Sequence, residues 1–499
     1  MTSATTITPT AYDTAWIASI PAEHSPNAPR FPAAIRWLVD HQLADGSWGS
    51  SIPYEHDRLL CTLAAVVPLA QFGQTSGEHA ALRSGIRYLQ EHGTLLSPES
   101  MELVAFELLL PTLVARAQRA GVSVPIGLDL YGPERTEKLG MIPAASLYSP
   151  GVTVVHSLEF LGDGADLAGL GRAQGPNGSI GNSPAATAFF FSRTANPAAL
   201  AYLDACMASN GGQSAPVLHP CDTFEVLWSA YHLHLAGLPT NHLIDEEVRH
   251  LLVQSLRDDG VSLDPTFPIP DADDTAVALI LLKALGLEVD PSVLQRFEAP
   301  DGHFYSFPFE RHPSAGVNIH VLHALLTVPG YVDVSPRIDD LLDYLASQQT
   351  AEGYWLDKWH ISPLYATSHA LAVFTQLKGP AVTCAQPMVD RARAWLRTTQ
   401  NRDGSWGCFG QATAEETAYA LLALAALDPD ATCVSDREKR TDGLAYLNTT
   451  LDRGTLDMEM FPAMWIDKCL YTPTPIVEAV IRAARAANRT LARQPELVA

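Results

Sequence analysis

Residues 271–282 (DADDTAVALILL) and residues 413–424 (TAEETAYALLAL) share the order acid-acid-Thr-Ala at the start of an apolar segment rich in Leu and Ala. Strand-like alternation of polar and apolar residues is scarce, and the length of such segments favours helices that are apolar on several faces. Pro and Gly cluster between the helical segments, as expected where short turns link packed helices. The sequence therefore predicts an all-α fold.

A second pattern, Gln-x-x-x-Gly-x-Trp, recurs after the helical segments. It occurs at Gln42–Trp48, Gln349–Trp355 and Gln400–Trp406, and in degenerate form at Gln174–Ile180. We interpret each copy as a helix end capped by Gly, with a Trp that stacks on the Gln amide as a packing device. Helix pairs repeated in this way can close into a ring. The prediction is an α/α barrel whose helix N-termini gather at one end.

The composition limits the size of the domains and the kind of ligand. With 499 residues, 47% of them hydrophobic, the chain exceeds what one core usually accommodates, so we expect two large domains. The formal net charge of −23 repels nucleic acid and anionic membrane surfaces. An anionic substrate would need a local basic patch or a bound cation to overcome this field.

Cysteine usage and the N-terminus indicate where the protein resides. The seven cysteines are widely spread and form no CxxC pair, which indicates reduced thiols rather than a zinc site. The N-terminus lacks the basic start and apolar core of a signal peptide, and no apolar run approaches the roughly 20 residues of a membrane span. We expect a soluble, cytoplasmic protein with no integral membrane segment.

Three carboxylates, Asp271, Asp273 and Asp274, stand at the start of the first apolar segment, directly after Pro270. Pro suits the first turn of a helix, and the helix dipole favours acidic residues there. Three carboxylates so close together cannot all ionise at low cost, so at least one should have a raised pKa and hold a proton near neutral pH. The segment is either an ordinary N-capping turn or a strong acid in a dry pocket.

The acidic motif, combined with the Gln…Gly…Trp pattern, resembles the class II terpene cyclases, which start cyclisation by protonating an alkene or epoxide. Four further segments resemble motifs of this family in the same order along the chain: Ala11–Trp16, His156–Glu159, Asp357–Trp359 and Trp465–Tyr471. The resemblance implies two α/α barrels, one inserted at residues 25–225 and one built from residues 1–24 and 226–499. The substrate would enter the cleft between them.

The resemblance also assigns roles at the acidic motif. Asp273 would be the proton donor, and Asp271 and Asp274 would tune its acidity. Ser314 and Asn318 occupy places where related cyclases hydrogen-bond the donor acid, although Asn318 could instead cap a helix.

Other residues match family positions that bind the diphosphate and a metal. Lys138 and Lys358 match lysines that hold the phosphates, and Arg135 and Lys468 are weaker candidates; each lysine could equally be a solvated side chain. Family members use Mg²⁺, which bridges phosphate oxygens with few protein ligands. Glu99 or Glu102 lies where the acidic metal motif is expected, but an exposed helix start fits as well.

Aromatic rings should line the cavity, because their electron-rich faces stabilise carbocations without quenching them. The candidates, each of which could instead be a core residue, are Trp228, Phe304, Phe307, Tyr365 and Phe409.

The residues that would end the reaction depart from the family pattern. In plant cyclases that make ent-copalyl diphosphate, the closing base is a water held by a His and an Asn. His156 matches the His, but Val217 stands in the place of the Asn. A cation that is not deprotonated at once can undergo hydride and methyl shifts, which favours a rearranged, clerodane-type product such as terpentedienyl diphosphate.

The resulting hypothesis is a class II diterpene cyclase that converts geranylgeranyl diphosphate into a bicyclic diphosphate, with a class I terpene synthase downstream. A copalyl-type product, or farnesyl diphosphate cyclised to drimenyl diphosphate, is the alternative. The Asp339-Asp340-x-x-Asp343 string fits a class I synthase but is interpreted as a solvated acidic helix face. A catalytically silent helical ring that binds a lipid or a protein is the remaining alternative.

Overall fold

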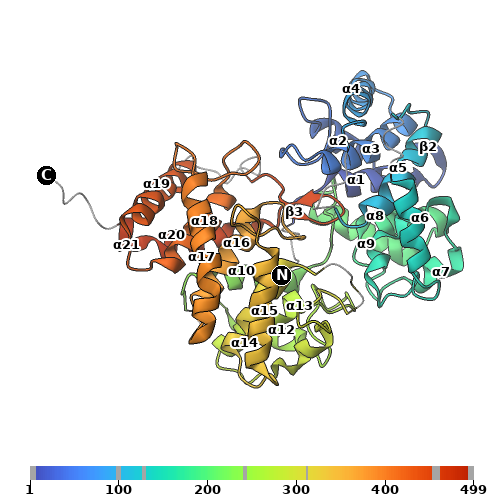
Figure 1. The fold of residues 1–499 in the computed structure, drawn as a ribbon. Helices are drawn as coiled ribbons and strands as arrows, with labels where there is room; N and C mark the ends of the chain where they lie inside the picture. The colour runs from blue at the N-terminus through green and yellow to red at the C-terminus, as the bar shows by residue number, and fades with distance from the viewer. Residues whose placement is uncertain are drawn as a thin grey trace. The chain divides into compact units, whose positions relative to one another are not determined.

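The protein is described by a computed structural model that covers residues 7–96, 103–125, 131–239, 244–308, 310, 313–451 and 461–492. Its elements are helices apart from two short antiparallel ribbons, β1 (Pro21–Ala22) with β2 (Ser25–Pro29) and β3 (Trp465–Ile466) with β4 (Leu470–Tyr471). The predicted all-α class is confirmed. The chain forms two compact units (Figure 1).

Unit 1 comprises Met1–Cys221, Thr266–Ile269 and Ala463–Pro473, and unit 2 comprises Asp222–Pro265, Pro270–Pro462 and Thr474–Ala499.

Unit 1 is a ring of inner helices covered by outer ones, and the two kinds alternate along the chain. The inner elements, each in contact with the next around a closed circle, are α1 (Ala11–Ala18), α3 (Glu55–Phe72), α5 (Phe106–Arg119), η2 (Thr153–Gly164) and α8 (Pro184–Thr194). The outer helices are α2 (Pro32–Asp40), α4 (Ser76–His92), α6 (Gly132–Met141), α7 (Leu167–Arg172) and α9 (Pro197–Ser209).

The division between the units differs from the predicted boundaries at the N-terminus. The prediction joined residues 1–24 to the second barrel, whereas the structure assigns the described part of this segment, residues 7–24, to unit 1. The reason is that α1 closes the unit 1 ring by packing between α3 and α8, and every residue of α1 is buried there. The β3–β4 ribbon also belongs to unit 1, because the Leu470 N–H donates to Asp57 Oδ1 at 2.8 Å.

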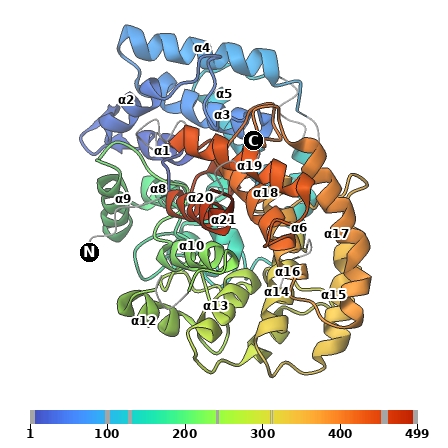
Figure 2. The same ribbon diagram turned by 90° about the vertical axis from the view of Figure 1, so that its left-hand side faces the viewer.

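Unit 2 repeats the same alternation on a larger ring. Its inner helices are α10 (Asp222–Leu235), α13 (Ala272–Ala284), α14 (Ala315–Thr327), α16 (Pro363–Phe374), α18 (Ala414–Leu427) and α20 (Thr474–Ala487), and α20 returns to pack on α10. The outer elements are α12 (Glu246–Ser255), η3 (Pro291–Phe297), α15 (Val334–Gln348), α17 (Pro380–Thr399), α19 (Val434–Leu451) and α21 (Arg489–Ala492). Figure 2 shows two of the outer helices, α15 and α17, lying side by side.

The difference between inner and outer helices follows from their sequences. The inner α16 and α18 are rich in Leu and Ala and almost wholly buried, whereas the outer α15 and α17 bury a single stripe. Hydrogen bonds join successive inner helix starts: Ser314 at the start of α14 donates to Asp357 in the loop before α16, and Ser362 donates to Glu416 of α18 at 2.6 Å. The predicted gathering of helix N-termini at one end is therefore observed.

The Gln…Gly…Trp pattern joins each outer helix to the next. Gln400 donates from Nε2 to the carbonyl of Gly404 at 2.8 Å and to that of Lys439 on α19 at 2.8 Å, while Trp406 Nε1–H donates to the Leu396 carbonyl at 2.9 Å. Gly404 has φ of +87°, and a Cβ there would lie 2.5 Å from the Asp442 carbonyl oxygen. The pattern is structural, as predicted, but the Gly lies in the turn beyond the helix end, and the Gln amide bonds to backbone carbonyls.

Candidate active site

The acidic motif begins α13 in unit 2. Asp271 is the N-cap, and its Oδ1 accepts from the Asp274 N–H at 2.7 Å. The Ala272 N–H donates to the Ser306 carbonyl at 2.9 Å, which fixes the entry of the chain into the helix. Asp273 and Asp274 are 8% and 3% exposed, so both carboxyl groups are almost removed from water.

Each of the two buried acids has a partner on another inner helix. Asp273 Oδ1 lies 2.6 Å from Nδ1 of His320 on α14, and Trp228 Nε1–H on α10 donates to Asp274 Oδ1 at 2.9 Å. The His320 ring packs against the Trp228 ring at a centroid distance of 4.8 Å. Packing of three neighbouring inner helices therefore creates the surroundings of the acids.

Burial raises the pKa of the acids in this motif. It raises the pKa of Asp274 to about 7 and that of Asp271 well above its usual range, with the neighbouring carboxylates adding to the effect. The pKa of Asp273 is also raised by burial, although the hydrogen bond and charge of His320 oppose the shift. The expectation that at least one carboxyl group has a raised pKa is met, and the motif can supply a proton near neutral pH.

Two residues predicted to hydrogen-bond the donor acid, Ser314 and Asn318, bond to other groups. The Ser314 hydroxyl caps α14 and donates to Asp357. Asn318 Oδ1 accepts from the Phe304 N–H at 2.7 Å, and Asn318 Nδ2 donates to the Phe304 carbonyl at 3.0 Å. Asn318 also donates to the Ser314 carbonyl at 2.8 Å. The structure therefore corrects both predictions: these side chains position the loop before α14 and make no hydrogen bond to Asp273.

The residue that does contact Asp273, His320, was missed although it ends the same sequence segment. Successive helical residues are rotated by 100°, so Asn318 and His320 lie about 200° apart around α14. Asn318 accordingly faces the Phe304 loop, while His320 faces the barrel interior. The signal that could have found it is this helical phase.

The aromatic candidates fall into two groups. Trp228 and Tyr365 are buried beside His320, with the Tyr365 ring centroid 6.4 Å from that of His320, and Tyr231 joins them at 5.4 Å. Tyr231 had not been predicted.

The other three aromatic candidates lie elsewhere. Phe304 is a core residue whose nearest aromatic ring contact is Tyr331, at 6.4 Å. Phe307 packs on Trp359 at 6.5 Å, and Phe409 is partly exposed in the loop before α18.

The predicted diphosphate lysines are both engaged with glutamates. Lys358 forms an ion pair with Glu310 and lies 4.8 Å from the centre of the Trp359 ring; its charge opposes the rise in the pKa of Asp273. In unit 1, Lys138 pairs with Glu107. A diphosphate would have to compete with these carboxylates for either lysine.

The weaker cationic candidates are structural. Arg135 donates to the Phe160 and Leu108 carbonyls at 2.7 Å and 3.2 Å. Lys468 is fully buried and donates to Glu159 at 3.0 Å.

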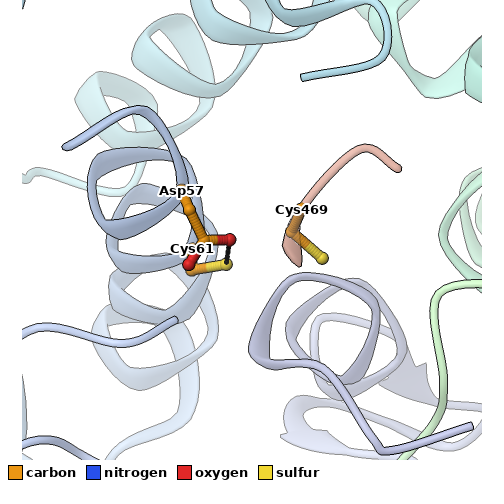
Figure 3. A group of neighbouring side chains, drawn as sticks. All are labelled: Asp57, Cys61 and Cys469. Atoms are coloured by element: carbon orange, nitrogen blue, oxygen red, sulfur yellow. Dashed lines mark hydrogen bonds between the residues drawn. The ribbon is translucent and has the colours of Figure 1, made fainter. Parts of the chain in front are cut away.

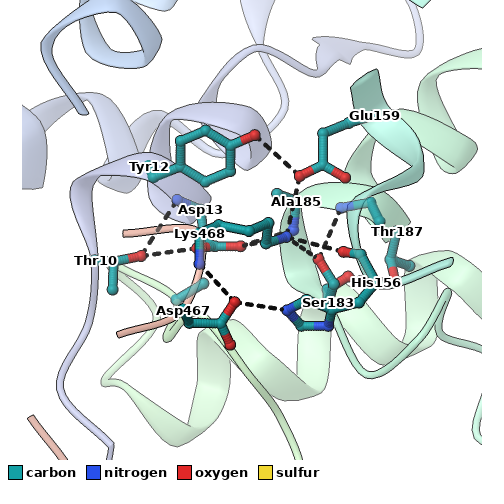
Figure 4. A network of polar contacts seen from close by, with 12 residues as sticks. Thr10, Tyr12, Asp13, His156, Glu159, Ser183, Ala185, Thr187, Asp467 and Lys468 are labelled. Atoms are coloured by element: carbon teal, nitrogen blue, oxygen red, sulfur yellow. Dashed lines mark hydrogen bonds and ion pairs between the residues drawn. The ribbon is translucent and has the colours of Figure 1, made fainter. Parts of the chain in front are cut away.

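Three of the family-like motifs meet in one buried network of unit 1 (Figure 4). Lys468, from the Trp465–Tyr471 motif, lies between Glu159 of the mid-chain motif and Asp13 of the N-terminal motif, 3.8 Å from Asp13 Oδ1. His156 Nδ1 lies 2.8 Å from the Gly181 carbonyl and Nε2 lies 3.0 Å from Asp467 Oδ1. Both nitrogens of His156 therefore have protein partners. Burial alone would lower the pKa of this ring, but the negative charge of Asp467 raises it.

Val217, which stands in the place of the Asn in plant cyclases, is fully buried.

The predicted metal ligands, Glu99 and Glu102, lie outside the described residues. Within the described ranges, the group of side chains close enough to share an ion is Asp57, Cys61 and Cys469 (Figure 3). Mg²⁺ prefers oxygen ligands, whereas two of these donors are thiols and both Asp57 oxygens already accept backbone N–H groups. This cluster does not fit magnesium, and the magnesium requirement stays a prediction.

The class I alternative is not supported by the position of its acidic string. Asp339 and Asp343 are exposed on the outer helix α15, and Asp340 pairs with Arg337 at 2.7 Å on the same helix. The interpretation as a solvated helix face agrees with this placement. Among the described helices, none has both the length and the apolar character needed to cross a membrane.

Comparison with known proteins gives a consistent set of relatives. The family model of the squalene-hopene cyclase C-terminal domain matches residues 309–473. A type B diterpene cyclase from Mycobacterium tuberculosis is 31% identical over 96% of this chain and 95% of its own length. An ent-copalyl diphosphate synthase from a Streptomyces species is 34% identical over 92% of this chain and 88% of its own. The solved ent-copalyl diphosphate synthase of Streptomyces platensis superposes with a TM-score of 0.77 and 28% identity, covering 97% of this chain and 96% of that one.

Proposed function

The chain belongs to the class II diterpene cyclases, and on that premise we propose that it cyclises geranylgeranyl diphosphate to a bicyclic diterpenyl diphosphate with Asp273 as the proton donor. The observation that carries the proposal is the buried Asp273–His320 pair at 2.6 Å, set at the head of an apolar inner helix. A carboxyl group whose pKa is raised by burial, beside electron-rich rings, is suited to protonating an alkene.

The reaction follows from this arrangement. Asp273 transfers its proton to the terminal double bond, whose electron pair forms the new C–H bond, and the electrons of the broken O–H bond stay on the carboxylate. The resulting cation is attacked in turn by neighbouring double bonds, while Trp228 and Tyr365 stabilise positive charge. Loss of a proton ends the sequence, so the net reaction is an isomerisation that retains the diphosphate.

The substrate assignment is supported by the relatives and by one local cation. The relatives at 31% and 34% identity are named as diterpene and ent-copalyl diphosphate enzymes, whose skeletons have twenty carbons. Lys358 lies in a motif whose lysine holds the phosphates in related cyclases, and it supplies a local positive charge in a protein of net charge −23. The proposed role of Lys358 requires exchange of its partner Glu310 for phosphate oxygens.

A rearranged, clerodane-type product such as terpentedienyl diphosphate is the form that we favour. The support is that the terminating base of plant enzymes is incomplete here: Val217 replaces the Asn, and both nitrogens of His156 are engaged with protein groups. A longer-lived cation has time for hydride and methyl shifts before deprotonation.

The test is to incubate purified protein with geranylgeranyl diphosphate and Mg²⁺, dephosphorylate, and analyse the extract by gas chromatography–mass spectrometry beside Asp273→Asn. A cyclic alcohol isomeric with geranylgeraniol, absent from the variant, is the expected result, and its mass spectrum distinguishes clerodane from copalyl skeletons. A product only from farnesyl diphosphate would overturn the substrate assignment. Undiminished turnover by Asp273→Asn would overturn the donor assignment.

A further inference from the structure

A cavity of about 340 Å³ lies in unit 2 among α19, α20, α21 and the turn that follows α10. Three arginines line it: Arg482 and Arg485 of α20, and Arg489, the first residue of α21. The volume is at the lower end of the range for small-molecule pockets, roughly 300–1,000 Å³. The cavity, which we name the arginine pocket, therefore has room for a small ligand.

The arginine pocket lies at the opposite end of the barrel from the acidic motif. The inner helices start at the end that holds Asp273, whereas Leu238 of the pocket follows the end of α10, where its N–H donates to the Leu233 carbonyl at 3.2 Å. Arg485 stands in the last turn of α20, roughly 16 Å along the axis from the start of that helix. A phosphate group bound here would therefore differ from the one proposed at Lys358, which precedes the start of α16.

The three guanidinium groups share one face and lack protein counter-charges. Their spacing of three and four residues places them on the same side of the chain, and all three side chains are exposed. Among the described residues, none of the three has an ion-pair or hydrogen-bond partner. The arginines of the outer helix α17 differ, since Arg393 and Arg397 both pair with Asp436.

This arrangement favours an anion as the missing partner. The helix dipole favours one cation in the last turn of α20, but it does not account for three around one cavity. Like charges at close range repel one another, and an anion among them would reverse the sign of each interaction.

Hydrogen bonds fix the helices that carry these arginines. Arg440 of α19 is 0% exposed and donates from Nε to Asn488 Oδ1 at 2.7 Å, and Asn488 Nδ2 donates to the Ala484 carbonyl at 2.7 Å. Asn488 lies between α20 and α21, so these bonds set the direction in which α21 leaves α20. The helices α19 and α21 are also in contact (Figure 1). The pocket is therefore built on anchored helices.

The rest of the lining indicates what kind of anion fits. Leu238, Leu444 and Ala486 form apolar walls, Asn448 adds an amide that can donate to an oxygen, and no carboxylate is among the described lining residues. Each guanidinium presents a planar fork that can bond to two oxygens of one anion. Three forks offer more donors than one carboxylate can accept, whereas a diphosphate or a phosphate ester has enough oxygens and charge. The apolar walls suit the carbon atoms of such an ester.

We propose that the arginine pocket binds the phosphate or diphosphate group of a soluble small molecule, with Arg482, Arg485 and Arg489 as its anchors. A lipid headgroup would offer the same chemistry. The net charge of −23, however, opposes the approach of this protein to an anionic bilayer, which favours a free molecule. The inference concerns binding away from Asp273, so it does not depend on the proposed function.

The test is isothermal titration of the full chain with inorganic diphosphate in the absence of Mg²⁺. Arg485→Ala removes one anchor, and Arg485→Lys keeps the charge without the fork. Arg437→Ala is the matched control, because Arg437 is an exposed arginine of α19 that does not line the pocket. Lys358→Ala separates this site from the diphosphate site proposed near the acid, and circular dichroism checks the folding of each variant.

We expect the wild type to bind inorganic diphosphate and Arg485→Ala to weaken Kd roughly 10- to 150-fold. Arg485→Lys should recover part of the loss, while Arg437→Ala and Lys358→Ala should retain binding in the pocket. No binding by the wild type, or equal binding by a folded Arg485→Ala/Arg489→Ala protein, would overturn the proposal.

Cosedimentation with phosphatidylglycerol vesicles distinguishes the two sources of phosphate. We expect no cosedimentation that depends on Arg485. Vesicle binding that requires Arg485, without binding of free diphosphate, would overturn the choice of a soluble ligand. Asp273→Asn should bind diphosphate in the arginine pocket as the wild type does, so the two proposals fail independently.

Discussion

Replacing His320 with Phe isolates the contribution of its hydrogen bond to proton transfer. The His320 ring is fully buried between Trp228 and Tyr231, at centroid distances of 4.8 Å and 5.4 Å, so an aromatic replacement preserves most of the packing. What the substitution removes is the Nδ1 group 2.6 Å from Asp273 Oδ1. The variant therefore changes the acid more than the cavity.

The expected loss of kcat follows from the hydrogen bond that the Asp273 carboxylate loses. A hydrogen bond to a charged group contributes about 1.5–3 kcal/mol. Because about 1.4 kcal/mol corresponds to tenfold in rate, kcat should fall roughly 10- to 150-fold. Because the His320 side chain contacts the acid, its removal should affect the proton-transfer step and leave KM nearly unchanged.

The pH dependence provides an independent check of the same contact. Asp273 must be protonated to act, so turnover is present below its pKa and is lost as the pH rises through it. His320 lowers that pKa against the effect of burial. Its removal should therefore raise the pKa of Asp273 and move the alkaline limb of the kcat profile to higher pH.

The assay is turnover at saturating geranylgeranyl diphosphate from pH 5 to 9, with Asp273→Asn as the floor and circular dichroism as the check on folding. A folded His320→Phe protein with less than a threefold loss of kcat and an unmoved alkaline limb would refute the reasoning. It would mean that the 2.6 Å contact has no influence on the acid during catalysis.

Three further predictions concern charge and stability. Lys358→Ala should raise KM for the diphosphate substrate about tenfold by removing a cation proposed to hold the phosphates, whereas an unchanged KM would exclude Lys358 from the diphosphate site. Asp274 has a pKa raised from 3.8 to about 7 in the folded protein, so its contribution to stability is full below pH 3.8 and is lost as the pH rises through about 7. In denaturant unfolding at different pH values, the free energy of unfolding of Asp274→Asn should lack this part of the pH dependence. A pH dependence identical to that of the wild type would contradict the raised pKa of Asp274. Lys468→Met leaves Glu159 and Asp13 buried without their cation and should lower the free energy of unfolding by about 3–5 kcal/mol; thermal unfolding with a loss under about 1 kcal/mol would show that the network is not stabilised by this charge.

The acidic motif illustrates what could be predicted from sequence. Asp271, Asp273 and Asp274 are close in the chain, and a helix start imposes their proximity whatever the rest of the protein does. The raised pKa values followed from that proximity and from the apolar segment behind it. The phosphate-lysine prediction was less complete, because the partner of Lys358, Glu310, lies 48 residues away and gave no local signal.

Ser314 and Asn318 show where a resemblance misleads. Both lie in the expected segment, yet their partners, Asp357 and the Phe304 backbone, were decided by loops that meet only after the helices pack. The same holds for α1, which closes the unit 1 ring although its sequence gives no sign of which barrel it joins.

The sequence by itself determined the helices, their repetition and the position of the acid, because helix periodicity, capping and the clustering of like charges act between residues a few positions apart. Only the tertiary structure decided which side chains surround that acid. His320 and His369 lie 49 residues apart in the chain, and His369 and His232 lie 137 residues apart. Only closure of the inner ring, driven by burial of largely apolar helices, brings them within hydrogen-bond distance.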